Sequence, residues 1–230
     1  EDPKKRVVIN KEVCEGCGDC SIQSSCVSIE PVETELGRKR KINQSSCNKD
    51  ISCIKGFCPS FVTVDADIKQ NTSFQDLGEF PEPKISINDQ VANIMLTGIG
   101  GTGVLTISAI LAYAAHYEGK DSSVLDMTGL AQKGGAVWSH IKIYEKGVAP
   151  FSQKISPGAA DILLACDGVV GTKPEIQEVI SKDRTLTVLN SNTAPVADFV
   201  TNRDLDFKNN DVFKMLEATT KKIVSLVPAI

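Results

Sequence analysis

The stretch CEGCGDC occupies residues 14–20 and places Cys14, Cys17 and Cys20 at intervals of three positions. Much farther along the chain, Cys58 is followed directly by a proline. Three closely spaced thiolates, with a fourth before a proline, form the arrangement that binds a cubic iron–sulfur cluster. The two glycines of the stretch let the loop fold tightly and bring backbone N–H groups toward the sulfurs. The sequence therefore predicts a 4Fe-4S cluster on these four cysteines.

The other cysteines of this region are Cys26, Cys47 and Cys53. Their spacings are stretched, but they lie where a second cluster would draw its ligands in a two-cluster ferredoxin. They could hold a three-iron cluster or a four-iron cluster with a non-cysteine fourth ligand, or some could be free buried thiols. A zinc site is disfavoured because there is no second C-x2-C pair, and because His116 and His140 lie far away in the sequence.

The composition excludes several classes of protein. A net charge of -4 does not indicate a nucleic-acid binder. No apolar run approaches the ~18 residues of a membrane span, and no secretory signal is present. Seven of the eight cysteines crowd into residues 14–58, so we expect metal-bound thiolates in a cytoplasmic protein instead of disulfides. The chain starts without Met and ends within an apolar pattern, which predicts a segment of a larger protein.

Three regions follow one another along the 230 residues. Residues 1–66 are rich in Cys, Ser and Asn, residues 67–90 read as a linker, and residues 91–230 alternate apolar runs with helical patterns. We predict strands at 93–97, 123–127, 137–144, 162–166 and 185–190, and helices at 104–118, 175–181 and 211–227. This alternation predicts an α/β fold with a doubly wound, mostly parallel sheet, preceded by a small ferredoxin-like domain. No internal repeat is evident.

Two glycine-rich stretches mark a second candidate site. Residues 98–103 lie between a strand and a helix and satisfy the pattern of a dinucleotide-binding loop, with Asp126 near the place of a ribose-binding acid. Residues 128–135 form another glycine-rich loop, where a dinucleotide domain would normally enter a helix. Two such loops at one sheet edge favour a docking surface or a lid around a different ligand. The candidate binding residues are Gly98, Gly100, Gly101, Gly103, Lys133, Gly134 and Gly135.

For several other residues, a structural or solvated role is the default interpretation. Lys133 could meet a phosphate or be solvated. The basic run at 38–41 could raise the potential of a neighbouring cluster or dock an acidic ferredoxin, and the alternative is a solvated hairpin tip. Core, turn or packing roles are expected for Trp138, Ser139, His140, Cys166, Asp167 and Asn190.

The segments CEGCGDC (14–20), GRKRKINQSSCNKD (37–50) and GFCPSFVTV (56–64) closely resemble the iron–sulfur segment of the large, fused bacterial indolepyruvate ferredoxin oxidoreductases. Residues 98–103 and 128–135 are similar to the two glycine loops in the gamma domain of the 2-oxoacid ferredoxin oxidoreductases. The resemblance covers nearly the whole chain. It implies a 4Fe-4S domain at 1–66 and a gamma domain at 91–230 that is truncated at its C-terminus, joined by the linker at 67–90.

This resemblance implies a thiamine-diphosphate enzyme that decarboxylates a 2-oxoacid, passes electrons singly through clusters to ferredoxin and releases the acyl group to coenzyme A. The chain lacks the family's Gly-Asp-Gly and Asn-Asn pattern for thiamine diphosphate and magnesium, so the carbon chemistry is expected in another part of the enzyme. The implied partners are ferredoxin and the alpha/beta regions of the same enzyme, in a homo-oligomer. Two alternatives are a flavin- or NAD-linked ferredoxin reductase and a non-enzymatic redox-sensing module.

Overall fold

The computed structural model describes residues 3–26, 28–44, 46–56, 58–65, 90–101, 103–129, 135–148, 150–191 and 209–226. The described residues before position 66 form one compact unit, and those after position 89 form another. Most of the predicted linker at 67–90 lies outside the described residues, so the domain boundaries stay predictions. Within the described ranges, no helix has both the length and the hydrophobicity that crossing a bilayer requires.

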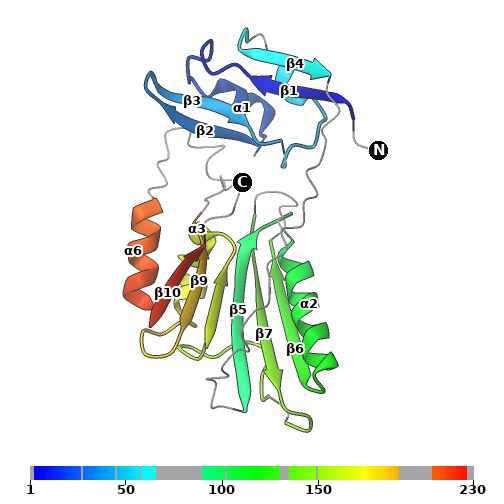
Figure 1. Ribbon diagram of the computed structural model, residues 1–230, viewed down its shortest axis with the longest axis vertical. Coiled ribbons are helices and arrows are strands. Elements are labelled where there is room, and N and C mark those ends of the chain that lie inside the picture. Colours follow the sequence, from blue (N-terminus) through cyan, green and yellow to red (C-terminus); the bar gives the residue numbers. More distant parts are fainter. Residues whose placement is uncertain are drawn as a thin grey trace, which may run out of the picture. The chain divides into compact units, whose positions relative to one another are not determined.

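The first unit repeats the order strand, helix, strand. Its elements are β1 (Lys5–Ile9), α1 (Asp19–Ser24), β2 (Ile29–Thr34), β3 (Gly37–Ile42), the 3-10 helix η1 (Ser52–Lys55) and β4 (Phe61–Asp65). The outer strands β1 and β4 pair antiparallel, and so do the inner strands β2 and β3 (Figure 1). This is the element order of ferredoxin-like folds, as predicted. The basic run at 38–41 lies within β3, not at the tip of its hairpin.

The core of the first unit is small and rich in cysteine. Ile9, Cys14 and Ile29 are buried, and the side chains that pack against them include three further cysteines. None of the eight cysteines, all of which lie in the described ranges, forms a disulfide. A unit of this size has a small core and marginal stability, which disulfides or bound metals can increase. Metal-bound thiolates would supply the missing cross-links.

The second unit is built on one six-stranded sheet. Its strands are β5 (Val91–Ile99), β6 (Asp121–Thr128), β7 (Ala136–Tyr144), β8 (Ile162–Ala165), β9 (Leu186–Asn190) and β10 (Lys222–Leu226). They lie in the order β10-β9-β8-β5-β7-β6, and of these six strands only β7 runs in the direction opposite to the others. The central strand β5 is buried along six consecutive residues, as expected for a strand covered on both faces.

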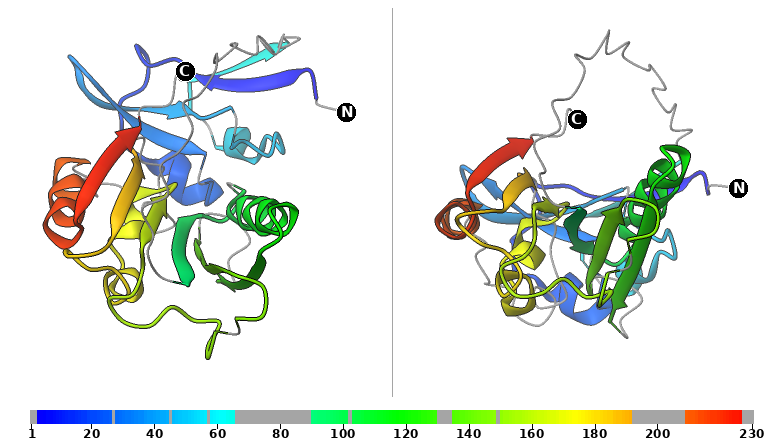
Figure 2. Two further views of the ribbon diagram at one scale, coloured as in Figure 1. Left: turned by 60° about the horizontal axis from the view of Figure 1, so that its bottom comes forward. Right: turned by 90° about the horizontal axis from the view of Figure 1, so that it is seen from below.

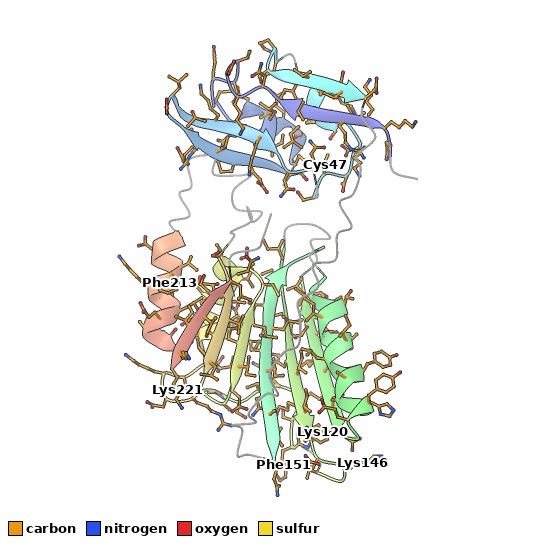
Figure 3. All side chains as sticks on the ribbon, in the orientation of Figure 1. Cys47, Lys120, Lys146, Phe151, Phe213 and Lys221 are labelled. Atoms are coloured by element: carbon orange, nitrogen blue, oxygen red, sulfur yellow. The ribbon has the colours of Figure 1, made fainter. Side chains whose placement is uncertain are left out.

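Helices cover both faces of this sheet (Figure 2). They are α2 (Val104–Tyr117), α3 (Gly168–Gly171), α4 (Pro174–Gln177) and α6 (Asn209–Thr219). On one face, Val104 of α2 packs with Leu96 of β5. On the other face, Leu216 of α6 belongs to the same core cluster as Met95 of β5, and Phe213 of α6 packs against that cluster (Figure 3). The doubly wound, mostly parallel α/β fold predicted from the sequence is therefore confirmed.

The predicted helix at 211–227 is wrong in its second half. The helix α6 ends at Thr219, and residues 222–226 form β10, which pairs in parallel with β9. The hydroxyls of Thr219 and Thr220 donate to carbonyls of the preceding helical turn, which helps to end the helix. The β-branched residues that follow, Ile223 and Val224, suit a strand. Similarly, the helix predicted at 175–181 is only the short α4.

The structure makes His140 a source of pH-dependent stability. Its side chain is 2% exposed, and its Nδ1 accepts a hydrogen bond from the Ile155 N–H at 3.2 Å. Burial, followed by the nearby Lys154 and Lys142, lowers the pKa of His140 to about 4. The unfolded chain then binds more protons than the folded chain between about pH 4 and 6.5, so stability is full above this window and falls as pH falls through it.

We expect the free energy of unfolding of the second unit to fall by roughly 3 kcal/mol through this window because of His140. In the His140→Asn variant, the amide oxygen can replace Nδ1 as the acceptor, but the side chain does not titrate. Urea unfolding at a series of pH values measures the effect. Equal pH dependence in the parent chain and the variant would contradict the assignment.

Candidate metal centre

The loop from β1 to α1 and the first turn of α1 carry three of the predicted ligands. Gly16 and Gly18 have φ values of 76° and 79°, in the left-handed region that glycine enters at low cost. A Cβ atom on Gly16 would lie 2.0 Å from the carbonyl oxygen of Arg38, so the loop lies directly against β3. The N–H of Gly16 also donates to the sulfur of Cys14 at 3.4 Å. Glycine at this position thus lets the backbone approach both β3 and the first sulfur.

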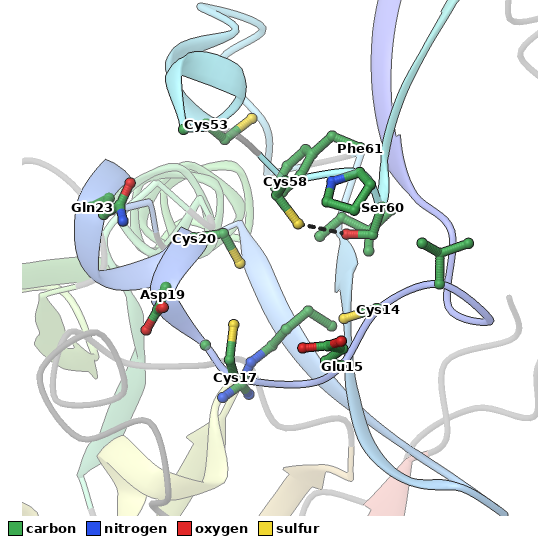
Figure 4. A pocket seen from close by; sticks show the side chains of 16 residues that line it. Cys14, Glu15, Cys17, Asp19, Cys20, Gln23, Cys53, Cys58, Ser60 and Phe61 are labelled. Carbon is green, nitrogen blue, oxygen red and sulfur yellow. Dashed lines mark hydrogen bonds between the residues drawn. The ribbon is translucent and has the colours of Figure 1, made fainter.

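Five cysteines border one cavity of about 280 Å³ in the first unit, and four of them are the predicted ligands of the first cluster. Cys14, Cys17 and Cys20 come from the loop and the start of α1, and Cys58 comes from the segment before β4. Figure 4 shows the sulfurs of these four side chains facing a shared space. The structure therefore brings together the four residues that the sequence predicted as ligands of the first cluster.

The donor set fits a cluster better than a single metal ion. Among the described residues, no three His, Cys, Asp or Glu side chains are close enough together to bind one ion. In a cubic cluster each thiolate binds a different iron, so the sulfurs surround a space instead of meeting at a point. Burial raises the pKa of Cys20. Because thiols bind metal only as thiolates, binding here must release protons.

Two further polar side chains border the same cavity. Arg40 of β3 is 1% exposed, so one member of the basic run is buried beside the thiols and is not part of a solvated surface. The Ser60 hydroxyl lies 3.1 Å from the sulfur of Cys58 and is 2% exposed (Figure 4). Positive charge and hydrogen bonds to sulfur stabilise the more negative, reduced state of a cluster.

From the sequence alone, the role of Arg40 is open and Ser60 does not stand out. The basic run at 38–41 was visible, but β3 places alternate residues on opposite faces, and only the fold decides which one turns inward. Ser60 gave one local signal, since it lies two residues after Cys58. A hydroxyl at this spacing could have been considered as a donor to the sulfur.

Replacing Ser60 by alanine is expected to lower the reduction potential of the first cluster by about 40 mV. With Cys58 bound to the expected cluster, its thiolate could not donate, so the Ser60 hydroxyl would be the donor of this hydrogen bond. Losing about 1 kcal/mol of preference for the reduced state corresponds to this shift for one electron. A redox titration followed by electron paramagnetic resonance measures it. Ser24→Ala is the control, because the Ser24 hydroxyl donates to a carbonyl. An unchanged or higher potential would contradict the role of Ser60.

The remaining cysteines form a second group in the first unit. Burial, followed by the nearby Cys26 and Cys47, raises the pKa of Cys53 to about 11. Cys53 also borders the cavity, but Figure 4 shows its sulfur turned away from the other four. Cys47 lies in the loop before η1 (Figure 3). The structure therefore does not bring all seven cysteines to one point.

The two glycine-rich loops meet at the end of the central strand. Ile99 of β5 pairs with Ala136 of β7, and the N–H of Gly100 donates to the carbonyl of Gly135 at 2.8 Å. Gly98 lies within β5, while Gly101 and Gly103 have φ values of 89° and 86°. The predicted site residues Lys133 and Gly134 lie outside the described residues. The described parts of the two loops are thus neighbours.

Asp126, the acid predicted at a ribose site, accepts hydrogen bonds from two serine hydroxyls. Asp126 lies within β6, and its Oδ1 accepts hydrogen bonds from Ser108 of α2 and Ser139 of β7. Both serines are buried, so the carboxylate joins the helix to the sheet.

The structural roles expected for other residues of the second unit are confirmed. Trp138 packs against the core of the sheet, and the carboxylate of Asp167 caps α3 by accepting from the N–H of Val170. The side chain of Asn190 donates to the carbonyl of Cys166.

A family model described as pyruvate ferredoxin/flavodoxin oxidoreductase matches residues 93–227. The chain therefore belongs to this family. Indolepyruvate oxidoreductase subunit IorB of Archaeoglobus fulgidus is 39% identical over 75 residues, which are 33% of this chain and 35% of that protein. The subunit IorB of Thermococcus kodakarensis is 31% identical over 77 residues, or 34% and 37% of the two chains. This chain spans about a third of the length of these curated relatives.

Solved structures of the same kind of oxidoreductase are also similar. Pyruvate oxidoreductase subunit PORC from Thermotoga maritima has a TM-score of 0.40 at 20% identity, over 60% of this chain and 62% of that chain. The gamma subunit of a keto/oxoacid ferredoxin oxidoreductase from Geobacter sulfurreducens has a TM-score of 0.35 at 22% identity, over 59% and 60% of the two chains. The resemblance predicted from the sequence is confirmed at the level of the family.

Proposed function

We propose that the first unit binds a four-iron cluster through Cys14, Cys17, Cys20 and Cys58. The observation that carries this proposal is the cavity of about 280 Å³ that these four side chains border. When bound, such a cluster accepts and releases single electrons. The chain's own residues hold it in place, add the charge of Arg40 at its edge and supply a hydrogen bond from Ser60.

Within this proposal, the chain is the electron-transfer and gamma portion of an indolepyruvate-type 2-oxoacid ferredoxin oxidoreductase. Membership of the pyruvate ferredoxin/flavodoxin oxidoreductase family and the names of the curated relatives support it. Thiamine diphosphate and magnesium act in another region of the enzyme, and coenzyme A accepts the acyl group. Ferredoxin and the alpha/beta regions are its partners. We also propose a cytoplasmic homo-oligomer.

We further propose that the glycine loops bind a phosphate-bearing ligand. The hydrogen bond between Gly100 and Gly135 supports this, because it places the two loops side by side at one end of the sheet. Backbone without side chains can approach a phosphate closely, and the adjoining helix α2 presents its N-terminal N–H groups. The ligand is not expected to be a nicotinamide dinucleotide, since both serine hydroxyls at Asp126 would compete with a ribose.

Anaerobic reconstitution with ferrous iron and sulfide tests the proposed function. The reconstituted chain should become brown, bind iron and sulfide in equal amounts and give an electron paramagnetic resonance signal on reduction. A colourless chain that binds zinc would refute it. Tight binding of NADH or FAD to the same chain would instead favour a flavin- or nicotinamide-linked reductase.

A further inference from the structure

The structure reveals a repeat that sequence analysis missed. Residues 14–20 read C-x2-C-x2-C, and residues 47–53 read C-x2-D-x2-C, with Asp50 in the position of the middle cysteine. In both stretches the last cysteine lies just inside a helix, since Cys20 is the second residue of α1 and Cys53 is the second residue of η1. The two stretches thus have the same spacing, and each leads into a short helix, an α-helix after the first and a 3-10 helix after the second.

The backbone conformation of the first loop is also repeated in the second loop. Of the described residues other than glycine, only Ser25, Lys49 and Ile51 have a positive φ. Lys49 and Ile51, at 62° and 58°, correspond to the two left-handed glycines of the first loop. A β-branched residue in this region is a strained outlier, which persists only where its surroundings require that conformation.

The contact to the first sulfur is also repeated. The N–H of Lys49 donates to the sulfur of Cys47 at 3.3 Å, as the N–H of Gly16 does to that of Cys14. The second loop therefore keeps the conformation of a cluster-binding loop in spite of two unfavourable residues. Neither the shared spacing alone nor a capping role for Asp50 explains why the two loops have the same backbone conformation and the same N–H to sulfur contact.

We propose that Asp50 binds one iron of a second cluster through a carboxylate oxygen. This proposal rests on the proposed function of the first loop. The remaining ligands are the thiolates of Cys26, Cys47 and Cys53. Cys26 completes the set because Cys58 belongs to the first cavity, and two-cluster ferredoxins exchange their fourth ligands between the halves. Cys26 and Cys53 also pack against the same small core.

The carboxylate of Asp50 has a structural role that is compatible with this one. Its Oδ1 accepts hydrogen bonds from the N–H and the hydroxyl of Ser52, at 3.1 and 2.9 Å. These bonds hold the carboxylate at the start of η1, and a carboxylate has two oxygens that can accept hydrogen bonds or bind a metal. Carboxylate oxygen is a harder donor than thiolate and suits iron–sulfur iron less well. The iron at Asp50 should therefore leave more readily than its neighbours.

The test uses the whole chain, reconstituted anaerobically and then treated with ferricyanide. The parent chain should bind about eight irons. On treatment, one ferrous ion should leave the second cluster as one electron passes to ferricyanide, and the three-iron cluster that remains should give its own electron paramagnetic resonance signal. The Asp50→Cys variant should retain all its iron and lack that signal. The Asp50→Ala variant should bind about seven irons and show the signal without loss of further iron.

Glu35→Ala is the matched control, because it removes one carboxylate from the turn between β2 and β3 of the same unit; it should behave as the parent chain. Identical iron content and oxidation behaviour in the parent chain and both Asp50 variants would overturn the proposal. It would also be overturned if the parent chain bound only about four irons, all lost in Cys17→Ala, and the proposed function would then still stand. A parent chain without iron would refute both.

Discussion

Replacing Cys58 by alanine is expected to lower the iron content of the reconstituted chain by about one to four atoms, from loss of the iron that Cys58 would bind up to loss of the whole first cluster. Three of the sulfurs lie on one continuous loop, but Cys58 comes from the far side of the cavity, before β4. Without it, the site has three ligands and an open edge, because Cys58 itself is exposed. Iron and sulfide analysis, together with electron paramagnetic resonance of the reduced chain, measures the loss.

The effect of Cys58→Ala should extend to folding. The first unit has a small core, and metal–thiolate bonds formed only in the folded state contribute directly to its stability. Cys166→Ala is the matched control, because Cys166 packs against the sheet of the second unit. It should leave the iron content unchanged. An iron content in Cys58→Ala equal to that of the control would contradict the ligand assignment.

The sequence predicted the elements whose signal is local. Apolar runs identified β5 to β9, and the glycine after Tyr117 and Glu118 marked the end of α2. It did not predict β10, because Ile223 and Leu226 lie at spacings that also continue the apolar face of α6. The parallel pairing with β9 distinguishes the two possibilities, and that pairing joins segments more than thirty residues apart. Local periodicity does not contain this information.

In the candidate site, too, the residues with a local sequence signal were predicted and those without one were not. Cys14, Cys17 and Cys20 were predicted because their spacing is local, and Cys58 because a proline follows it. The second loop was overlooked for a different reason. Asp50 stands where a cysteine was sought, and neither Lys49 nor Ile51 signals a left-handed conformation. Backbone geometry, which the sequence does not display, reveals the repeat.

Replacing Gly16 by alanine is expected to destabilise the first unit by about 3 kcal/mol or more. A left-handed φ costs a residue with a Cβ atom roughly 1–2 kcal/mol. In addition, the new Cβ would lie 2.0 Å from the carbonyl oxygen of Arg38, so the loop would have to move away from β3. That movement would displace Cys14 and Cys17 from the cavity. Chemical denaturation gives the loss of stability, and iron analysis gives the loss of binding.

The Gly37→Ala variant separates the cost of the left-handed backbone from the cost of the close contact with β3. Gly37 has a φ of 88°, but a Cβ atom on it would meet nothing within 4 Å. Its substitution should therefore cost only the backbone strain, roughly 1–2 kcal/mol, and should leave the iron content unchanged. The difference between the two variants measures the contact between the ligand loop and β3. If Gly16→Ala lost no more stability or iron than Gly37→Ala, close packing of the loop against β3 would not be what positions the ligands.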